Sequence, residues 1–151
     1  MRAWRIAKQA HALDRSGAGG HAEAGRWHEQ GQAVLYAGLS PEICVLEKLA
    51  HTGQFLPADL VLVELSLPEG AALYLETPLG ELPKGWDALP PGTASAGHGS
   101  RFLRAGQALG LIIPSAIVPE ARNIVINPLH PAFTQVTMAV LRPFRFDQRL
   151  R

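Results

Sequence analysis

An arginine and a tryptophan stand together in a glycine-flanked segment, Gly25-Arg26-Trp27-His28, and Tyr36 follows shortly after it. A guanidinium can hold a phosphate through several donors, and an indole offers a flat surface for an aromatic ring. The segment therefore indicates a site for a phosphate beside a ring. On spacing alone, the plainer alternative is a surface arginine next to a tryptophan that fills the core.

The carboxylate of Glu47 falls inside a predicted helix that starts after Ser40 and runs to about Thr52. Ser40 provides an N-cap oxygen, and Pro41 suits the first helical position. Helical periodicity places Glu47 at the border of an apolar arc. The arc comprises Ile43, Val45, Leu46, Leu49 and Ala50. At the wall of a cleft, this carboxylate could stabilise positive charge on a ribose, whereas the plainer alternative is a solvated helix glutamate.

Two polar segments in the second half of the chain carry a serine and two asparagines. Pro114-Ser115 follows an apolar run, and Asn123 precedes the block Asn127-Pro128-Leu129-His130-Pro131. The chain has no Gly-x-Ser-x-Gly elbow, which would expose and activate a serine nucleophile, so we expect Ser115 to form hydrogen bonds instead. Asn127-Pro128 is also a common turn starter, which gives Asn127 a structural alternative.

Motifs for common cofactors and metals are missing from the sequence. It contains no Gly-x-Gly-x-x-Gly, no Walker loop, no cysteine pair and no His-Glu-x-x-His. The six histidines are scattered without metal-ligand spacing. We therefore expect neither a Rossmann dinucleotide site nor a bound metal.

Composition favours a small globular protein over a nucleic-acid-binding or membrane protein. The 151 residues are 47% hydrophobic and 18% charged, which suits a single domain spanning 1–151. Fourteen basic and thirteen acidic residues leave a net charge of +1, so direct binding to nucleic acid is not expected. No apolar run reaches the ~18 residues of a membrane span. The lone Cys44, expected to be a small core residue, fits a reducing compartment, and we expect a cytoplasmic protein.

The elements that must position these residues are short strands, long loops and two helices. Apolar runs predict strands at 4–7, 33–37, 60–67, 111–113, 123–127 and 136–146. The segment 11–32 is predicted to be mostly loop, 78–99 an irregular connection, and Ser100 to Leu109 a short helix closed by Gly110. This pattern predicts an α+β fold with a mixed or antiparallel β-sheet and flanking helices.

Taken in order, these segments resemble the RES domain family, the toxin half of RES–Xre toxin–antitoxin pairs. The family takes its name from an Arg, a Glu and a Ser. The resemblance runs along nearly the whole chain, through Trp4-Arg5-Ile6, Gly25-Arg26-Trp27, Val34-Leu35-Tyr36, Ser40, Glu47, Pro114-Ser115-Ala116, Asn123 and 126–131. Two positions depart from the expected pattern: His28 stands where we expect an asparagine at the rim of the site, and Phe102 stands where we expect a tryptophan.

The resemblance implies an ADP-ribosyltransferase-like fold and an enzyme that consumes NAD⁺ as substrate without a metal. It implies catalytic roles for Glu47 at the ribose, Arg26 at the phosphates and Tyr36 against the nicotinamide or its ribose. Ser115 would orient nicotinamide or ribose by a hydrogen bond. The full set expected to bind NAD⁺ is Arg5, Arg26, Trp27, Tyr36, Ser115 and Asn127.

Three functions stay open at this point. The first is cleavage of NAD⁺ at the nicotinamide–ribose bond, with water or phosphate as acceptor, and Val45 two residues before Glu47 favours such small acceptors. The second is transfer of ADP-ribose to a specific protein. The third is a non-enzymatic module that binds an antitoxin. The resemblance also implies an Xre-family helix-turn-helix antitoxin that covers the NAD⁺ cleft, and it allows a homodimer within the toxin–antitoxin complex.

Overall fold

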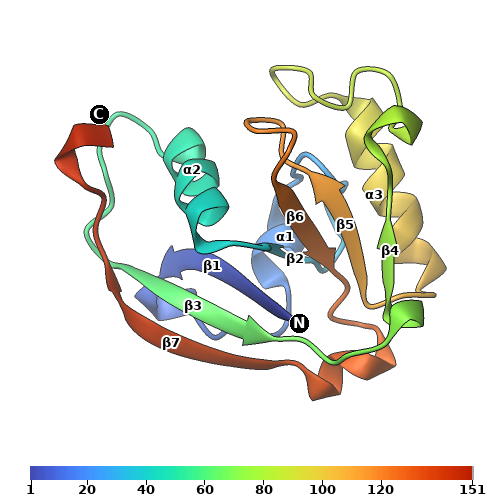
Figure 1. Ribbon diagram of the computed structural model, residues 1–151, viewed down its shortest axis with the longest axis horizontal. Coiled ribbons are helices and arrows are strands. Elements are labelled where there is room, and N and C mark those ends of the chain that lie inside the picture. Colours follow the sequence, from blue (N-terminus) through green and yellow to red (C-terminus); the bar gives the residue numbers. More distant parts are fainter. Residues whose placement is uncertain (151) are drawn as a thin grey trace.

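A computed structural model describes residues 1–150 and shows one seven-stranded sheet with three helices (Figure 1). The strands are β1 Arg2–Lys8, β2 Leu35–Gly38, β3 Leu60–Ser66, β4 Tyr74–Glu76, β5 Gly110–Pro114, β6 Arg122–Ile126 and β7 Thr137–Phe144. The helices are α1 Ala18–Ala22, α2 Pro41–His51 and α3 Thr93–Ala105. Among residues 1–150, no helix combines the length and apolar character that a bilayer crossing needs.

The sheet order is β4-β5-β6-β2-β1-β3-β7, and β4–β5 is its parallel pair while the other pairs are antiparallel. This confirms the predicted α+β fold with a mixed sheet. β1 pairs with β3 along its whole length, but it meets β2 at one register position, Trp4 opposite Gly38. The sheet therefore divides into two wings, β1-β3-β7 and β4-β5-β6-β2, that diverge at the β1–β2 junction (Figure 1).

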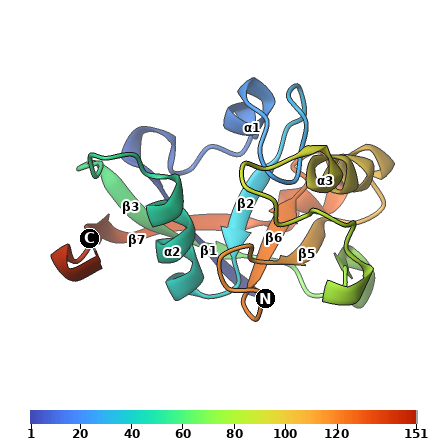
Figure 2. The same ribbon diagram turned by 90° about the horizontal axis from the view of Figure 1, so that it is seen from above.

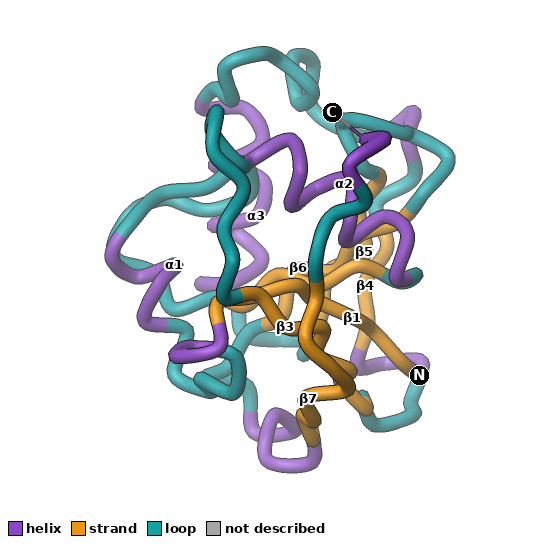
Figure 3. The backbone as a smooth tube through the Cα atoms, turned by 90° about the vertical axis from the view of Figure 1, so that its left-hand side faces the viewer, coloured by secondary structure: helices purple, strands orange, loops and turns teal. Residues whose placement is uncertain are grey.

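Helices α2 and α3 lie on the same side of the sheet, and β2 lies between them when the molecule is seen from above (Figures 2 and 3). Each helix packs on its own wing. One apolar cluster joins Ile43 and Cys44 of α2 to β1 and β3, and a second joins Phe102 of α3 to β5 and β6. A third cluster fills the opposite face and spans both wings. The side that carries α2 and α3 thus has two separate cores with a space between them.

Strand β3 shows why its sequence is nearly continuous in apolar residues. Val61, Val63 and Leu65 belong to the core that spans both wings, whereas Leu60 and Leu62 belong to the core under α2. Alternate side chains of a strand point to opposite faces, so a strand buried on both faces is apolar throughout. The prediction of an interior strand at 60–67 is confirmed, since β3 pairs with β1 on one side and β7 on the other.

Helix α2 begins as predicted, because Ser40 Oγ accepts a hydrogen bond from the Ile43 N–H at 3.3 Å. The expected arc packs on the core at Ile43, Val45 and Leu46. It departs from the prediction at Cys44, which is also buried, and at Ala50, which is exposed. A β-carbon at Gly38 would lie only 2.7 Å from Cys44 Sγ, so the glycine lets this edge of the helix approach β2 closely. Glu47 lies one turn beyond the buried Ile43 and Cys44 and consequently faces the sheet.

Helix α3 corrects the prediction of a short helix from Ser100 to Leu109. It runs from Thr93 to Ala105 and ends at Gly106, whose φ of 62° is left-handed, whereas Gly110 begins β5. The first half of the helix is rich in glycine and serine, which weakens its local helical pattern. Those small residues matter for packing, because a β-carbon at Gly99 would overlap the Trp27 carbonyl oxygen. The short edge strand β4 was also not predicted.

Two glycine-to-alanine substitutions in α3 test this close approach. Gly99→Ala places a methyl group against the Trp27 backbone, and we expect it to lower the free energy of unfolding by about 1–3 kcal/mol. Gly97→Ala meets only Arg101 Nη1 at 3.6 Å, so it should raise stability by about 0.5–1 kcal/mol through helix propensity. Urea unfolding of both variants measures the difference. Equal stability of the two variants would contradict the packing of α3 on Trp27.

Candidate active site

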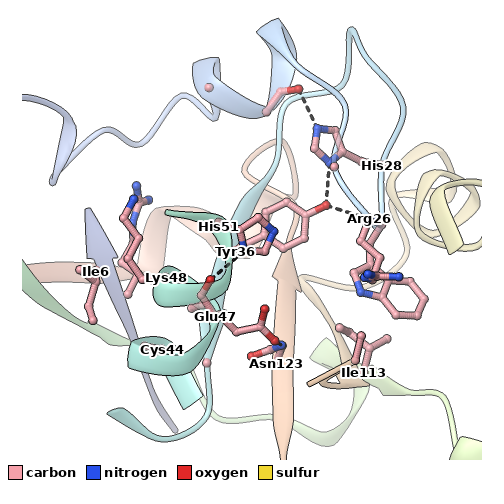
Figure 4. Close-up of a pocket in the computed structure, with 18 of the residues that line it drawn as sticks. Ile6, Arg26, His28, Tyr36, Cys44, Glu47, Lys48, His51, Ile113 and Asn123 are labelled. Carbon is pink, nitrogen blue, oxygen red and sulfur yellow. Dashed lines mark hydrogen bonds between the residues drawn. The ribbon is translucent and has the colours of Figure 1, made fainter. Parts of the chain in front are cut away.

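A cavity of about 420 Å³ lies between the two wings (Figure 4). Its wall comes from β1 and β2, from one side of α2, from the loop that contains residues 19–28, and from Ile113, Ala116 and Asn123 near the ends of β5 and β6. These segments are far apart in the sequence. The cavity contains most of the residues singled out by sequence: Arg5, Arg26, Trp27, Tyr36 and Glu47.

Glu47 reaches from α2 across the cavity toward the other wing (Figure 4). Its Oε1 accepts hydrogen bonds from Ser115 Oγ at 2.8 Å and from Asn123 Nδ2 at 2.6 Å. Ser115 follows β5, and Asn123 is the second residue of β6 and pairs with Ile113 of β5. Two donors on a rigid strand pair therefore hold one carboxylate oxygen in place. Asn123 was noted in the sequence but was not predicted as a site residue.

Ser115 is fully buried and is not part of the cavity wall. Its hydroxyl donates a hydrogen bond to Glu47, and its oxygen accepts hydrogen bonds from the N–H groups of Ile117 and Val118 at 3.0 and 3.2 Å. A hydroxyl has one proton and two lone pairs, so these three bonds use its full capacity. Ser115 therefore holds Glu47 in place from outside the cavity wall, and its direct contact with nicotinamide or ribose stays a prediction.

Arg26 lines the cavity, and its guanidinium is tied to a neighbouring loop. Its Nη1 donates to the carbonyl oxygens of Trp86 and Ala88 at 2.9 and 3.0 Å. Trp27 is buried and stacks on Trp86 with ring centroids 6.0 Å apart. The same apolar cluster contains Phe102, which occupies the place where a tryptophan was expected. Trp27 therefore both fills the core and contributes to the cavity wall.

Tyr36 and His28 form a hydrogen-bonded pair beside the cavity (Figure 4). Tyr36 Oη lies 2.6 Å from His28 Nδ1 and accepts the Trp27 N–H at 3.3 Å. Burial raises the pKa of Tyr36 well above its ordinary value, so the phenol stays protonated near neutral pH. His28 is 2% exposed, which corrects the expectation that this position lies at the rim.

Two cations besides Arg26 line the cavity, Arg5 of β1 and Lys48 of α2. Lys48 lies on the side away from Arg26 (Figure 4). Arg5 Nη1 is buried and has no hydrogen-bond partner within residues 1–150. Burial lowers the pKa of Arg5. The pKa of Lys48 is also lowered, first by burial and then by the nearby charges of Lys8 and Arg5. Lys48 was not predicted, because a lysine next to a helical glutamate is usually solvated.

Two further polar groups have mainly structural contacts. Cys44 Sγ donates to the Trp4 carbonyl oxygen at 2.8 Å, and burial raises the pKa of the thiol to about 11, so it is a poor nucleophile at neutral pH. Asn127 is buried outside the cavity wall. Its Oδ1 accepts the Leu129 N–H at 3.0 Å, which is the turn contact given as its structural alternative.

Comparison with solved structures shows a similar fold in a toxin. The chain superimposes on the "M.tuberculosis MbcT-MbcA toxin-antitoxin complex" with a TM-score of 0.66 at 18% identity, covering 94% of this chain and 84% of that one. At this level of identity, the likeness concerns the fold. It agrees with the expected α+β class of fold.

Sequence relatives cover almost the entire chain. A protein of Sphingobium sp. (strain YBL2) named "Prs ADP-ribosylating toxin" is 39% identical, over 97% of this chain and 94% of its own length. Proteins named "Toxin Res" from Pseudomonas putida and Photorhabdus laumondii are 37% and 35% identical, over 97% and 89% of this chain and 97% and 86% of their own lengths. The family model described as "RES domain" matches residues 2–147. The chain therefore belongs to the RES domain family.

Proposed function

We propose that this protein is the toxin of a toxin–antitoxin pair and that it breaks the nicotinamide–ribose bond of NAD⁺. The observation that carries the proposal is the Glu47 carboxylate, held by Ser115 and Asn123 in the wall of a cavity. The same wall includes Arg5, whose buried Nη1 has no hydrogen-bond partner within residues 1–150. The relatives named as toxins support the first half of the proposal, and the relative named as ADP-ribosylating supports the second.

The chemistry needs few groups. When the bond between the ribose C1′ and the pyridinium nitrogen breaks, its electron pair leaves with nicotinamide, which becomes neutral, and the ribose becomes an oxocarbenium-like cation. No strong general acid is required. A carboxylate fixed beside the ribose stabilises that cation, and a carboxylate already oriented by Ser115 and Asn123 needs little reorganisation. Glu47 would act through the oxygen that these two residues do not hold.

Positive charges around the cavity suit the two phosphates of NAD⁺. Arg5 offers a buried N–H group that lacks a partner in residues 1–150, and a phosphate oxygen would satisfy it. Arg26 keeps further donors beyond the Nη1 group bound to Trp86 and Ala88, so it can also approach a phosphate. Tyr36 would stack against the nicotinamide or its ribose, with Trp27 in the wall behind it. Asn127 keeps its place in the turn.

A second candidate is transfer of ADP-ribose to a protein. It uses the same residues and differs in the group that attacks the ribose cation: a protein side chain instead of water or phosphate. The relative named "Prs ADP-ribosylating toxin" favours this candidate, because it is 39% identical over nearly the whole chain. Val45, two residues before Glu47, favours a small acceptor, since it is apolar and packs with the core under α2.

An antitoxin completes the proposal. We infer a helix-turn-helix partner of the Xre family that covers the cavity, in a cytoplasmic complex that can contain two copies of this chain. DNA contacts would then belong to the antitoxin, in keeping with the net charge of +1 on this chain.

The first test removes the charge of Glu47. Glu47→Gln keeps the size of the side chain, and we expect NAD⁺ consumption to fall by about 10²–10³-fold because the ribose cation loses its counter-charge. The matched control is Glu42→Gln, an exposed glutamate of the same helix, which should leave consumption unchanged. Cellular NAD⁺ is measured after brief expression without antitoxin. Persisting NAD⁺ loss in Glu47→Gln would refute the role of Glu47. With wild type, growth arrest at intact NAD⁺ would favour protein ADP-ribosylation, and unchanged growth at intact NAD⁺ would favour the non-enzymatic antitoxin-binding module.

A second test compares two arginines of β1. Arg5→Gln should raise the KM for NAD⁺ by about ten- to a hundredfold, because a charge-assisted bond to phosphate is lost. Arg2→Gln is the control, since Arg2 is exposed and lies 3.9 Å from Glu64 on the surface. Purified protein and a nicotinamide-release assay give both constants. An unchanged KM in Arg5→Gln would remove Arg5 from the phosphate site.

The acceptor is tested with biotin-labelled NAD⁺ in cell lysate. With a small acceptor, free nicotinamide accumulates and no protein becomes labelled. With a protein acceptor, one discrete labelled band appears, and it is absent with Glu47→Gln. Such a band would decide for protein ADP-ribosylation over hydrolysis or phosphorolysis.

A further inference from the structure

The hydrogen bonds around His28 have directions that follow from the chemistry of their atoms. Nε2 lies 2.8 Å from the Gly20 carbonyl oxygen and 2.7 Å from the Glu23 carbonyl oxygen. Carbonyl oxygens only accept, so Nε2 carries a proton. In a neutral imidazole, Nδ1 then has a free lone pair, and the Tyr36 hydroxyl 2.6 Å away must donate to it.

The alternative direction leaves a buried group unsatisfied. If Nδ1 also carried a proton, Tyr36 Oη would accept from both His28 and the Trp27 N–H, and the phenol proton would have no acceptor among these partners. Unsatisfied buried donors are costly. The neutral Nε2–H form satisfies every group, in a chain that runs from Trp27 N–H through Tyr36 and His28 to the carbonyls of Gly20 and Glu23.

The loop that carries His28 is shaped to meet both rings. A β-carbon at Gly25 would lie 2.9 Å from His28 Cε1 and 3.0 Å from Tyr36 Oη, which is closer than ordinary contact. The absence of a side chain at Gly25 therefore lets the loop close over the pair. Through its two nitrogens, the imidazole joins β2, by way of Tyr36, to the end of α1, by way of Gly20 and Glu23.

We propose that His28 is a positioning residue that accepts a hydrogen bond from the Tyr36 hydroxyl, so that Tyr36 presents its ring and not its hydroxyl to the substrate. This inference rests on the proposed use of NAD⁺ and deepens it. It assigns Tyr36 the role of a ring surface that contacts the nicotinamide or its ribose and takes no part in acid–base chemistry. The raised pKa of Tyr36 agrees, because a phenol that stays protonated is no general base near neutral pH. His28 acts through Tyr36 and does not need to touch the substrate.

A matched pair of substitutions separates the two nitrogens of His28. Glutamine can place its amide nitrogen where Nε2 lies, so His28→Gln keeps the bond to the loop and loses the acceptor for Tyr36. Asparagine can place its amide oxygen where Nδ1 lies, so His28→Asn keeps the acceptor and loses the bond to the loop. Each is made with Tyr36 and with Tyr36→Phe, and KM and kcat for NAD⁺ are measured in all variants.

We expect His28→Gln to raise the KM for NAD⁺ by about three- to tenfold with little change in kcat, and we expect this rise to vanish in the Tyr36→Phe background. The effect of His28→Asn should be the same in both backgrounds. A rise with His28→Gln that persists without the Tyr36 hydroxyl would overturn the proposal, as would an unchanged KM. Both results would show that His28 does not act through that hydroxyl.

Two readouts do not depend on NAD⁺. The ¹⁵N chemical shifts of the His28 ring in the wild-type protein should show a protonated Nε2 and a bare Nδ1, and a protonated Nδ1 would overturn the inference even if the variants fail to fold. Melting temperatures of the same variants should show coupling between His28→Gln and Tyr36→Phe. If the tautomer and the coupling are both found but the wild-type protein leaves NAD⁺ intact, the inference on His28 stands and the proposed function is refuted.

Discussion

The carboxylate of Glu47 connects the two halves of this molecule, because it extends from a helix packed on one wing and is held by residues of the other. Ser115 and Asn123 are 68 and 76 positions away from it in sequence, and both donate to the same oxygen. A charge-assisted hydrogen bond of this kind is stronger than a neutral one. The orientation of Glu47 therefore depends on the relative position of the wings, and so does the shape of the cavity between them.

The opening between the wings has a simple origin in the sheet. β1 and β2 meet at one residue pair, which lets the strands on either side diverge, and α2 and α3 each build a separate core on their own wing. Side chains of the third core hold the wings together from the opposite face. Because each wing has its own packed core, polar groups can line the cavity between the wings while the cores stay buried.

Placing Arg5 and Lys48 in the wall of one cavity costs free energy, because burial removes water from both cations. A bound anion would offset that cost. Arg5 has lost part of its hydration without gaining a hydrogen-bond partner for Nη1 in residues 1–150. Lys48 lies close enough to Arg5 for the charge of Arg5 to lower the pKa of Lys48. Desolvated cations in one cleft attract phosphate strongly, even though the net charge of the chain is only +1. In the proposed function, the local charge and not the total would suit the cavity to a dinucleotide.

The sequence by itself determined the family, the capped start of α2 at Ser40 and the doubly buried strand β3, because ordered motifs, caps and periodicity are properties of short stretches. Only the tertiary structure decided that Cys44 joins the buried face of α2, how far α3 extends, that Ser115 holds Glu47, and that His28 is buried and not at a rim. Each of these depends on a close approach between segments, at Gly38, Gly99 or Gly25 or across the cavity. Local patterns in the sequence contain no record of such distances.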